Sequence, residues 1–202
     1  LIVDGTQSVG ALPFDLEVVR PDALVVAGYK WLFGPYSIGL AYFGPRYLDG
    51  VPLEETWIAR EGSEDFQGLV DYRDDYQTGA IRFDVGERSN FILVPMMRAA
   101  LDLVLQWRPE RIQAYVEDLT RGLLEEAQGL GYVVESPRYR AGHLFGLRMP
   151  GGVEMNALKV ALERENVSAS LRGSALRVGP HVFNDAGDVE ALNLALKAGV
   201  EA

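Results

Sequence analysis

Two short apolar runs, each followed by a polar side chain, constrain the fold of this chain more than any other feature. Residues 1–3 lead directly into Asp4, and residues 23–27 lead within three positions to Lys30. Apolar, β-branched runs of this length are typical of buried parallel strands. One strand–crossover–strand unit separates Asp4 from Lys30, so we expect neighbouring strands that carry both side chains at their carboxyl ends, where α/β sheets bind ligands.

Lys30 has two interpretations. Burial lowers the pKa of an amine and makes it a nucleophile toward carbonyls, which favours a catalytic lysine. A lysine that extends its ammonium group from a strand end into water is the commoner case. The acid and amide that follow the first strand, Asp4 and Gln7, favour the catalytic interpretation.

Composition excludes several functions. The chain has 202 residues, 48% of them hydrophobic, and a net charge of −10 without a run of Lys or Arg, so we expect no nucleic-acid partner. It has no cysteine, which excludes disulfides, thiolate metal ligands and cysteine nucleophiles in these residues. No apolar stretch is long enough for a membrane span and no signal peptide is visible, so we expect a cytoplasmic protein without a membrane partner.

The predicted architecture is α/β in two parts. Because the first residues read as a buried strand without an initiator Met, we expect the C-terminal half of a longer protein. Residues 1–108 are predicted to be the second half of a large, mostly parallel, three-layer sheet domain. Residues 109–202 are predicted to be a smaller α+β domain.

Periodicity and turn residues predict the individual elements. Strands are expected at 1–3, 23–27, 38–43, 132–134, 144–149, 168–171 and 176–178, and helices at 89–107, 109–129, 154–166 and 189–198, with a short helix within 9–19. Asp185 and Asp188 are expected to cap the last helix. Met96, Met97 and Leu105 are expected in the core of the 89–107 helix. Residues 51–79 hold no period and are either a functional lid or disordered.

A carboxylate and a nucleophilic amine at one crevice suit few small molecules, and pyridoxal phosphate is one of them. Its aldehyde forms a Schiff base with lysine, and a carboxylate keeps its ring nitrogen protonated so that the ring can accept an electron pair. Several motifs, in the order in which they occur along the chain, then indicate one family. Residues 4–10 and 22–35, Arg82-Phe83-Asp84-Val85-Gly86, and residues 176–184 (Leu-Arg-Val-Gly-Pro-His-Val-Phe-Asn) resemble the class V aminotransferase family of fold type I pyridoxal-phosphate enzymes.

The resemblance implies a role for each matching residue. Lys30 would be the Schiff-base lysine and proton shuttle, Asp4 the partner of the pyridinium nitrogen, and Gln7 a hydrogen-bond donor to the phenolic oxygen. Arg177 would bind the substrate α-carboxylate with two parallel hydrogen bonds, although a surface ion pair is the alternative for an isolated arginine.

The phosphate side departs from the family pattern. Many members have Ser or Thr three residues before the lysine and His directly before it, where this chain has Ala27 and Tyr29. Tyr29 is expected to donate to the phosphate instead. After Gly86 many members have a Thr that reaches the partner subunit's phosphate. Here Arg88 or Ser89 is the candidate for that role, and the family's usual homodimer is expected.

The sequence leaves the reaction open. An aminotransferase acting on small amino acids and keto acids is the first expectation. A cysteine-independent lyase, a kynureninase-like hydrolase or an epimerase is the alternative. A non-catalytic α/β interaction module or truncated fragment is the second alternative. The desulfurase mechanism is not expected because it needs a cysteine.

The remaining polar candidates are weak. His143 and His181 are too isolated for a metal site, so no metal is expected, and His143 is expected to make a local hydrogen bond. Trp31 is expected to pack beside the lysine.

Overall fold

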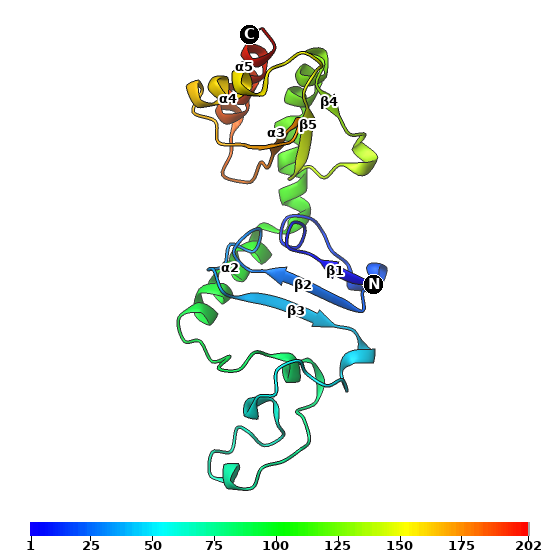
Figure 1. The fold of residues 1–202 in the computed structure, drawn as a ribbon, viewed down its shortest axis with the longest axis vertical. Coiled ribbons are helices and arrows are strands. Elements are labelled where there is room, and N and C mark those ends of the chain that lie inside the picture. Colours follow the sequence, from blue (N-terminus) through cyan, green and yellow to red (C-terminus); the bar gives the residue numbers. More distant parts are fainter. Residues whose placement is uncertain (202) are drawn as a thin grey trace. The chain divides into compact units, whose positions relative to one another are not determined.

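The computed structural model describes residues 1–201, which form two compact units divided between Gln106 and Trp107. Each unit has its own sheet and is described by itself (Figure 1). The division of the whole protein into domains at residues 1–108 and 109–202 stays a prediction.

The first unit is built on a three-stranded sheet in the order β1-β2-β3. β1 and β2 are parallel and β2 and β3 are antiparallel, so the expected neighbouring pair that ends at Asp4 and near Lys30 is present. The elements of this unit are β1 (Ile2–Asp4), α1 (Leu16–Val19), β2 (Ala23–Ala27), β3 (Gly39–Phe43), η1 (Pro45–Tyr47), η2 (Trp57–Ala59), η3 (Gly68–Val70), η4 (Gly79–Phe83) and α2 (Leu93–Trp107).

Only one face of this sheet is covered within the unit. Leu24 and Val26 of β2 are buried and share a core with Met97 of α2, whereas Val25 between them is exposed. Side chains alternate across a strand, so the face that carries Asp4 and Val25 is the open one.

α2 corrects two core assignments. Met97 is buried as expected, but Met96 and Leu105 are exposed. The helix packs on a single face of the sheet. Fewer of its apolar side chains therefore contact other residues than the sequence pattern suggests.

The second unit is an antiparallel four-stranded sheet in the order β4-β5-β7-β6, with three helices that share its core. Its elements are α3 (Pro109–Gly129), β4 (Val133–Val134), η5 (Pro137–Tyr139), β5 (Phe145–Arg148), α4 (Met155–Arg164), β6 (Ser170–Arg172), β7 (Ala175–Val178) and α5 (Ala186–Glu201).

The core of this unit follows the strand alternation. Leu147 and Leu176 lie opposite each other on β5 and β7 and are fully buried against Leu158 of α4 and Leu196 of α5. The predicted capping pair is confirmed, because Asp188 N donates to Asp185 Oδ1 and Asp185 N donates to Asp188 Oδ2. α5 begins three residues earlier than expected.

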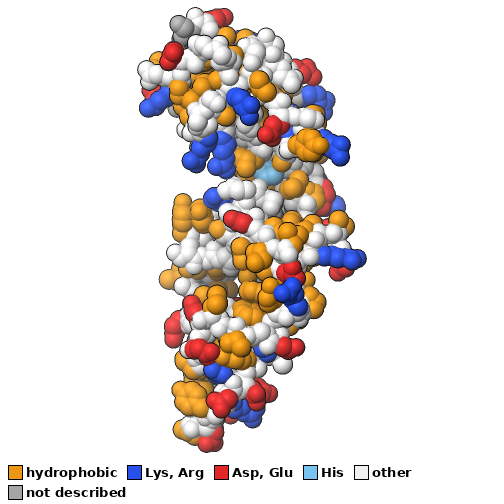
Figure 2. Space-filling model, turned by 45° about the vertical axis from the view of Figure 1, so that its right-hand side comes forward, with side chains coloured by type: hydrophobic (Ala, Val, Ile, Leu, Met, Phe, Trp, Pro, Cys, Tyr) orange, Lys and Arg blue, Asp and Glu red, His pale blue; other side chains and the backbone are white. Residues whose placement is uncertain are grey.

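Many large apolar side chains remain on the surface of both units (Figure 2). Val25 and Leu40 of the first sheet and Tyr139 and Val160 of the second unit are among them.

Leu196→Ala should lower the free energy of unfolding by about 2–5 kcal/mol, because it leaves a cavity where α5 meets the sheet. Chemical denaturation measures this. Leu194→Ala on the same helix, whose side chain is 43% exposed, is the matched control and should change stability by less than about 0.5 kcal/mol. Equal losses would contradict the packing of α5 described here.

Candidate active site

Thr6 joins the carboxyl ends of β1 and β2. Its backbone N donates to Asp4 Oδ1 (3.0 Å), and its hydroxyl oxygen accepts a hydrogen bond from Ala27 N (3.1 Å). Gly5 N also donates to Val25 O (2.8 Å). The turn that follows Asp4 is therefore fixed to the strand that leads to Lys30.

The carboxyl group of Asp4 is held in its ionised form. Hydrogen bonds from the side chain and backbone of Thr6 lower its pKa, and the positive charge of Lys30 lowers it further. An ionised carboxylate is the state that a protonated ring nitrogen needs as a partner. Because β1 and β2 are parallel, the acid at the end of β1 and the amine that follows β2 lie toward the same end of the sheet.

The segment that carries Lys30 is a tight turn. Gly28 N donates to Ile38 O (2.9 Å), Gly34 N donates to Gly28 O (2.8 Å) and Phe33 N donates to Lys30 O (3.0 Å). Phe33 has a φ of 57°, in the left-handed region that a side chain rarely adopts. At Gly34 a Cβ would lie 2.3 Å from the sulfur of Met97, so this turn lies directly on α2.

Lys30 is exposed, which corrects the expectation of a buried amine. The strand before it is buried on one face only, and Lys30 lies in the turn three residues beyond the carboxyl end of β2. Its amine lies 5.7 Å from the centre of the Tyr29 ring, which stacks on Tyr36 at 4.4 Å. Tyr29 thus lies beside Lys30, and its predicted contact with the phosphate stays a prediction.

Gln7 is oriented by Trp31. The indole Nε1 donates to Gln7 Oε1 (3.2 Å), which engages the amide carbonyl; the role of Gln7 toward the phenolic oxygen stays a prediction. Gly10 lets the two turns approach each other: its φ is 97°, and a Cβ there would lie 2.4 Å from the carbonyl oxygen of Trp31. Trp31 packs beside the lysine turn, as expected.

A concavity of about 720 Å³ extends from the ends of β1 and β2 across the β3 edge to the start of α2. Asp4 and Thr6 lie at one end of it, and Asp84, Arg88 and Asn90 line another part. This volume is in the range of small-molecule sites. Asp4 is a lining residue, whereas Lys30 is not.

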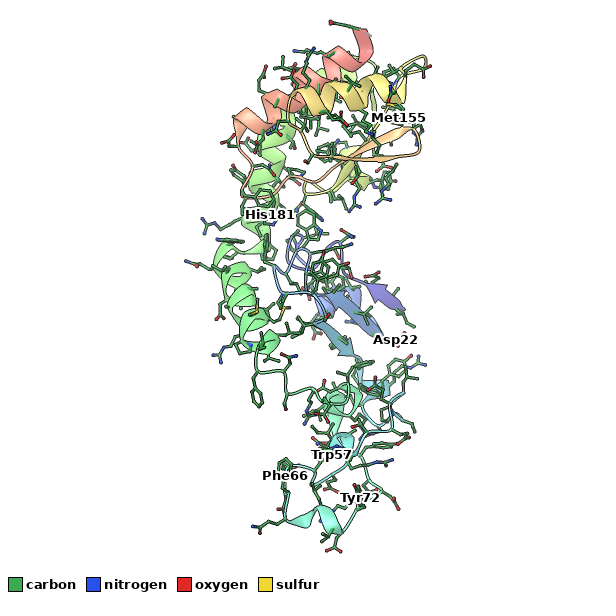
Figure 3. All side chains as sticks on the ribbon, turned by 60° about the vertical axis from the view of Figure 1, so that its left-hand side comes forward. Asp22, Trp57, Phe66, Tyr72, Met155 and His181 are labelled. Carbon is green, nitrogen blue, oxygen red and sulfur yellow. The ribbon has the colours of Figure 1, made fainter. Side chains whose placement is uncertain are left out.

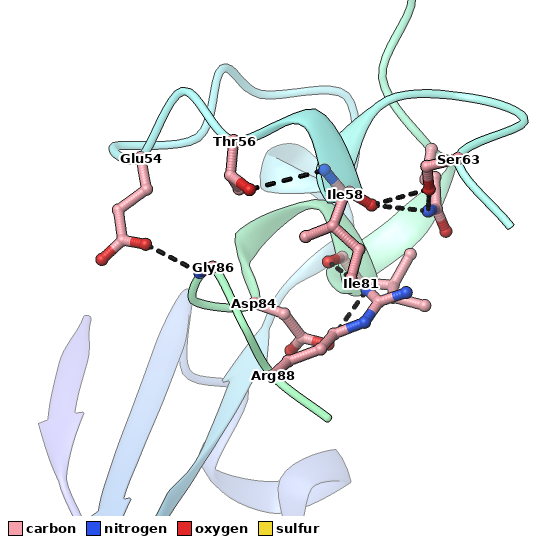
Figure 4. A network of polar contacts seen from close by, with 9 residues as sticks. Glu54, Thr56, Ile58, Ser63, Ile81, Asp84, Gly86 and Arg88 are labelled. Carbon is pink, nitrogen blue, oxygen red and sulfur yellow. Dashed lines mark hydrogen bonds and ion pairs between the residues drawn. The ribbon is translucent and has the colours of Figure 1, made fainter. Parts of the chain in front are cut away.

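The stretch that contains Ser89 is anchored by polar contacts (Figure 4). Gly86 N donates to Glu54 Oε2 (2.9 Å), and Arg88 Nη1 lies 3.3 Å from Asp84 Oδ2. Arg88 is therefore engaged in an ion pair, while Ser89 is exposed. Arg82, first in the matched motif, is buried and donates to the carbonyls of Gln77 and Gly50, which is a structural role.

Residues 51–79 contact one another through specific hydrogen bonds and an aromatic ring contact. Gln77 Nε2 donates to Ile58 O and to Ser63 Oγ, both at 2.8 Å, and Tyr76 donates to Glu55 (2.7 Å). Trp57 and Phe66 meet edge to face (Figure 3). Of the two alternatives for this stretch, the structure is inconsistent with disorder. Whether it acts as a lid stays untested.

Arg177 lies on β7 in the second unit, opposite Gly146 on one side and Ser170 on the other. Its neighbours Leu176 and Val178 are buried against the helices, so alternation places Arg177 on the other face of the sheet. The side chain is half-buried.

Two buried histidines support the segment after Arg177. His143 Nδ1 lies 2.8 Å from Gln113 Nε2, which confirms the expected local hydrogen bond. His181 N donates to Asn184 Oδ1 (3.0 Å), and Tyr115 of α3 donates to Asn184 O (2.6 Å). Burial, together with the nearby His143, lowers the pKa of His181 to about 4.

Sequence reasoning missed Thr6 and the support from Gln113 and Asn184. The position of Thr6 directly after a strand-ending Asp-Gly pair was a usable signal, because hydroxyl groups at such turns bond nearby backbone. Gln113 carried no such signal, since its partners lie 29 and 30 residues away in the sequence.

The comparisons decide the family. A family model described as aminotransferase class V matches residues 1–192. The chain belongs to the class V aminotransferase family.

Its relatives are longer proteins. An uncharacterized aminotransferase of Schizosaccharomyces pombe is 25% identical over 99% of this chain and 50% of its own length. A cysteine desulfurase of Synechococcus elongatus is 30% identical over 90% of this chain and 27% of its own length. The chain thus spans half or less of these curated relatives.

Solved structures share the fold. A cysteine desulfurase of Thermococcus onnurineus NA1 matches 99% of this chain and 52% of its own with a TM-score of 0.75 and 19% identity. A C-DES mutant with glycine covalently linked to its pyridoxal phosphate cofactor matches 96% and 50%, with a TM-score of 0.76 and 20% identity. These matches confirm the α/β fold that the resemblance implied. This chain corresponds to the second half of such proteins.

Pyridoxal 5′-phosphate, the cofactor expected from the sequence, is confirmed by membership in the class V family. The donor set fits it, because an ionised carboxylate, an amine and an oriented amide lie at or just beyond the carboxyl ends of β1 and β2. Within residues 1–201, no three His, Asp or Glu side chains are grouped to hold a metal ion. No helix in that range is long and apolar enough to cross a membrane.

Lowering the pH from 6.5 to 4 should reduce the free energy of unfolding of the second unit, by up to about 3 kcal/mol from His181 alone. The pKa of His181 is lowered from 6.5 to about 4 in the folded state, so the unfolded chain binds the proton first. Stability from this group is complete above pH 6.5 and declines until about pH 4. Denaturation at several pH values measures it, and His181→Phe should flatten the dependence. An unchanged slope in that variant would assign the effect to other groups.

Proposed function

We propose that the full-length protein containing this chain is a pyridoxal-phosphate-dependent aminotransferase that acts on a small amino acid and a keto acid. The observation that carries the proposal is the placement of Asp4 and Lys30 at or just beyond the carboxyl ends of two paired parallel strands. An acid held ionised by Thr6 and by the lysine charge lies at the end of the strand parallel to the one that precedes Lys30.

Each residue then has one task. When bound, pyridoxal phosphate supplies a ring that accepts the electron pair released at the substrate α-carbon. Lys30 would hold the cofactor through its amine, and the same amine, once released by the incoming substrate, would move the proton to and from the α-carbon. Asp4 holds a proton on the ring nitrogen, Gln7 donates its NH2 to the phenolic oxygen, and Tyr29 donates its hydroxyl to the phosphate.

Arg177 binds the α-carboxylate of the amino acid. A guanidinium group donates two parallel hydrogen bonds to a carboxylate, which fixes the orientation of the α-carbon. Gly146 and Ser170 on either side of it are small and leave room for the substrate.

We further propose a homodimer in which Ser89 hydrogen-bonds the phosphate of the partner's cofactor. The exposure of Ser89 favours it over Arg88, which pairs with Asp84.

A lyase, hydrolase or epimerase reaction is the second candidate, because the same residues serve those reactions. We retain this candidate because the chain is similar in sequence to a cysteine desulfurase and similar in fold to a cystine C–S lyase. With no cysteine in these residues, transfer of sulfur to a thiol of this part is not proposed. Keto-acid release that needs an amino acceptor would support transamination, and release without one would support the second candidate.

Borohydride treatment of the yellow full-length protein should attach the cofactor irreversibly to Lys30, as mass spectrometry of the peptides would show. Lys30→Ala should abolish the label and the activity. Lys159→Ala, an exposed lysine on α4, is the matched control and should keep both. A colourless wild-type protein without label would instead favour a non-catalytic module.

Arg177→Gln should lower kcat/KM for the amino acid by roughly 10- to 100-fold, since a charge-assisted pair contributes about 1.5–3 kcal/mol. Lysine at this position should recover only part of the loss, because it lacks the planar fork. Steady-state kinetics measure both variants. An unchanged KM and kcat in Arg177→Gln would remove Arg177 from the substrate site.

A further inference from the structure

The outer face of the second sheet carries three arginines. The pairing of the strands places Arg177 between Gly146 and Ser170, and places Ala175 between Arg148 and Arg172. Positions two apart on a strand share a face, so Arg148, Arg172 and Arg177 all project on the side opposite the helices.

These side chains are close enough to act on one small ligand. Arg148 and Arg172 are each diagonal neighbours of Arg177 across one strand pair, which puts each of them about 7–8 Å from it, with the Cβ atoms somewhat closer. The residues between them are small: Gly146, Ser170 and Ala175. At Gly146 an added Cβ would meet no atom within 4 Å, so the surface between the arginines is open.

The charges of Arg148 and Arg172 are not balanced by side chains of the described residues. The strand positions that share the face carry no carboxylate, although Asp and Glu outnumber Lys and Arg by 29 to 19 in the chain. Within residues 1–201, Arg148 and Arg172 form no ion pair or hydrogen bond, and both are exposed. Like charges on neighbouring strand positions repel, so an anion that binds between them is stabilised.

We infer that Arg148 and Arg172 bind a second carboxylate, and that the substrate of the Arg177 site is a dicarboxylic amino acid or keto acid. The inference rests on the proposed function, which assigns the α-carboxylate to Arg177. Arg148 and Arg172 lie at diagonal positions from it, so either can bind the distal carboxylate of a short chain.

Acceptor specificity of the full-length enzyme tests this. 2-Oxoglutarate and 2-oxopentanoate have the same carbon chain and differ in the distal carboxylate. The double variant Arg148→Gln/Arg172→Gln should lose roughly 10- to 100-fold in kcat/KM for 2-oxoglutarate and less than about 3-fold for 2-oxopentanoate. Lysine at both positions should recover part of the preference, because it keeps the charge. Arg121→Gln on α3, an exposed arginine paired with Asp118, is the matched control and should change neither value.

Calorimetric titration with glutarate gives a readout without turnover, and its affinity should fall in the double glutamine variant and not in Arg121→Gln. A yellow, borohydride-labelled enzyme whose preference and glutarate affinity do not change in the double variant would overturn this inference and leave the proposed function standing. A change of oligomeric state with unchanged acceptor preference would also overturn it, and would assign the face to a protein contact. A wild-type protein without label at Lys30 would overturn both.

Discussion

The parallel pairing of β1 with β2 is the constraint on which the rest of the site depends. It brings the carboxyl ends of two strands to one edge, and Thr6 then bonds to both of them. The acid on the first strand and the amine after the second interact through their charges, and the amide of Gln7 is oriented by the turn that carries the amine. Without this register the three groups would not lie toward the same end of the sheet.

Sequence reasoning recovered the elements and their order because periodicity and turn residues act locally. The α3 boundaries at Pro109 and Gly129, the β2 strand and the Asp185–Asp188 cap are determined by residues within a few positions. Burial was less predictable, since it depends on which faces meet other residues. Met96 and Leu105 are apolar but exposed, and Lys30 follows a strand that is buried on one face but is itself exposed.

Residues of the candidate site could be predicted only where their own type and their neighbours in the sequence indicate a chemical role. Asp4, Gln7 and Lys30 follow strand ends, and that position alone drew attention to them. The three-arginine face could not be seen in this way, because Arg148 comes from a strand distant in sequence from Arg172 and Arg177. Only the pairing of β5, β6 and β7 shows that they share one surface.

Gly10 has no side chain, yet it constrains the position of the turn that carries Lys30. Its positive φ and its contact with the Trp31 carbonyl leave no space for a methyl group. An alanine at this position would push the backbone outward one residue after Lys30. The position of Lys30 is therefore sensitive to a hydrogen-for-methyl exchange 20 residues upstream in the chain.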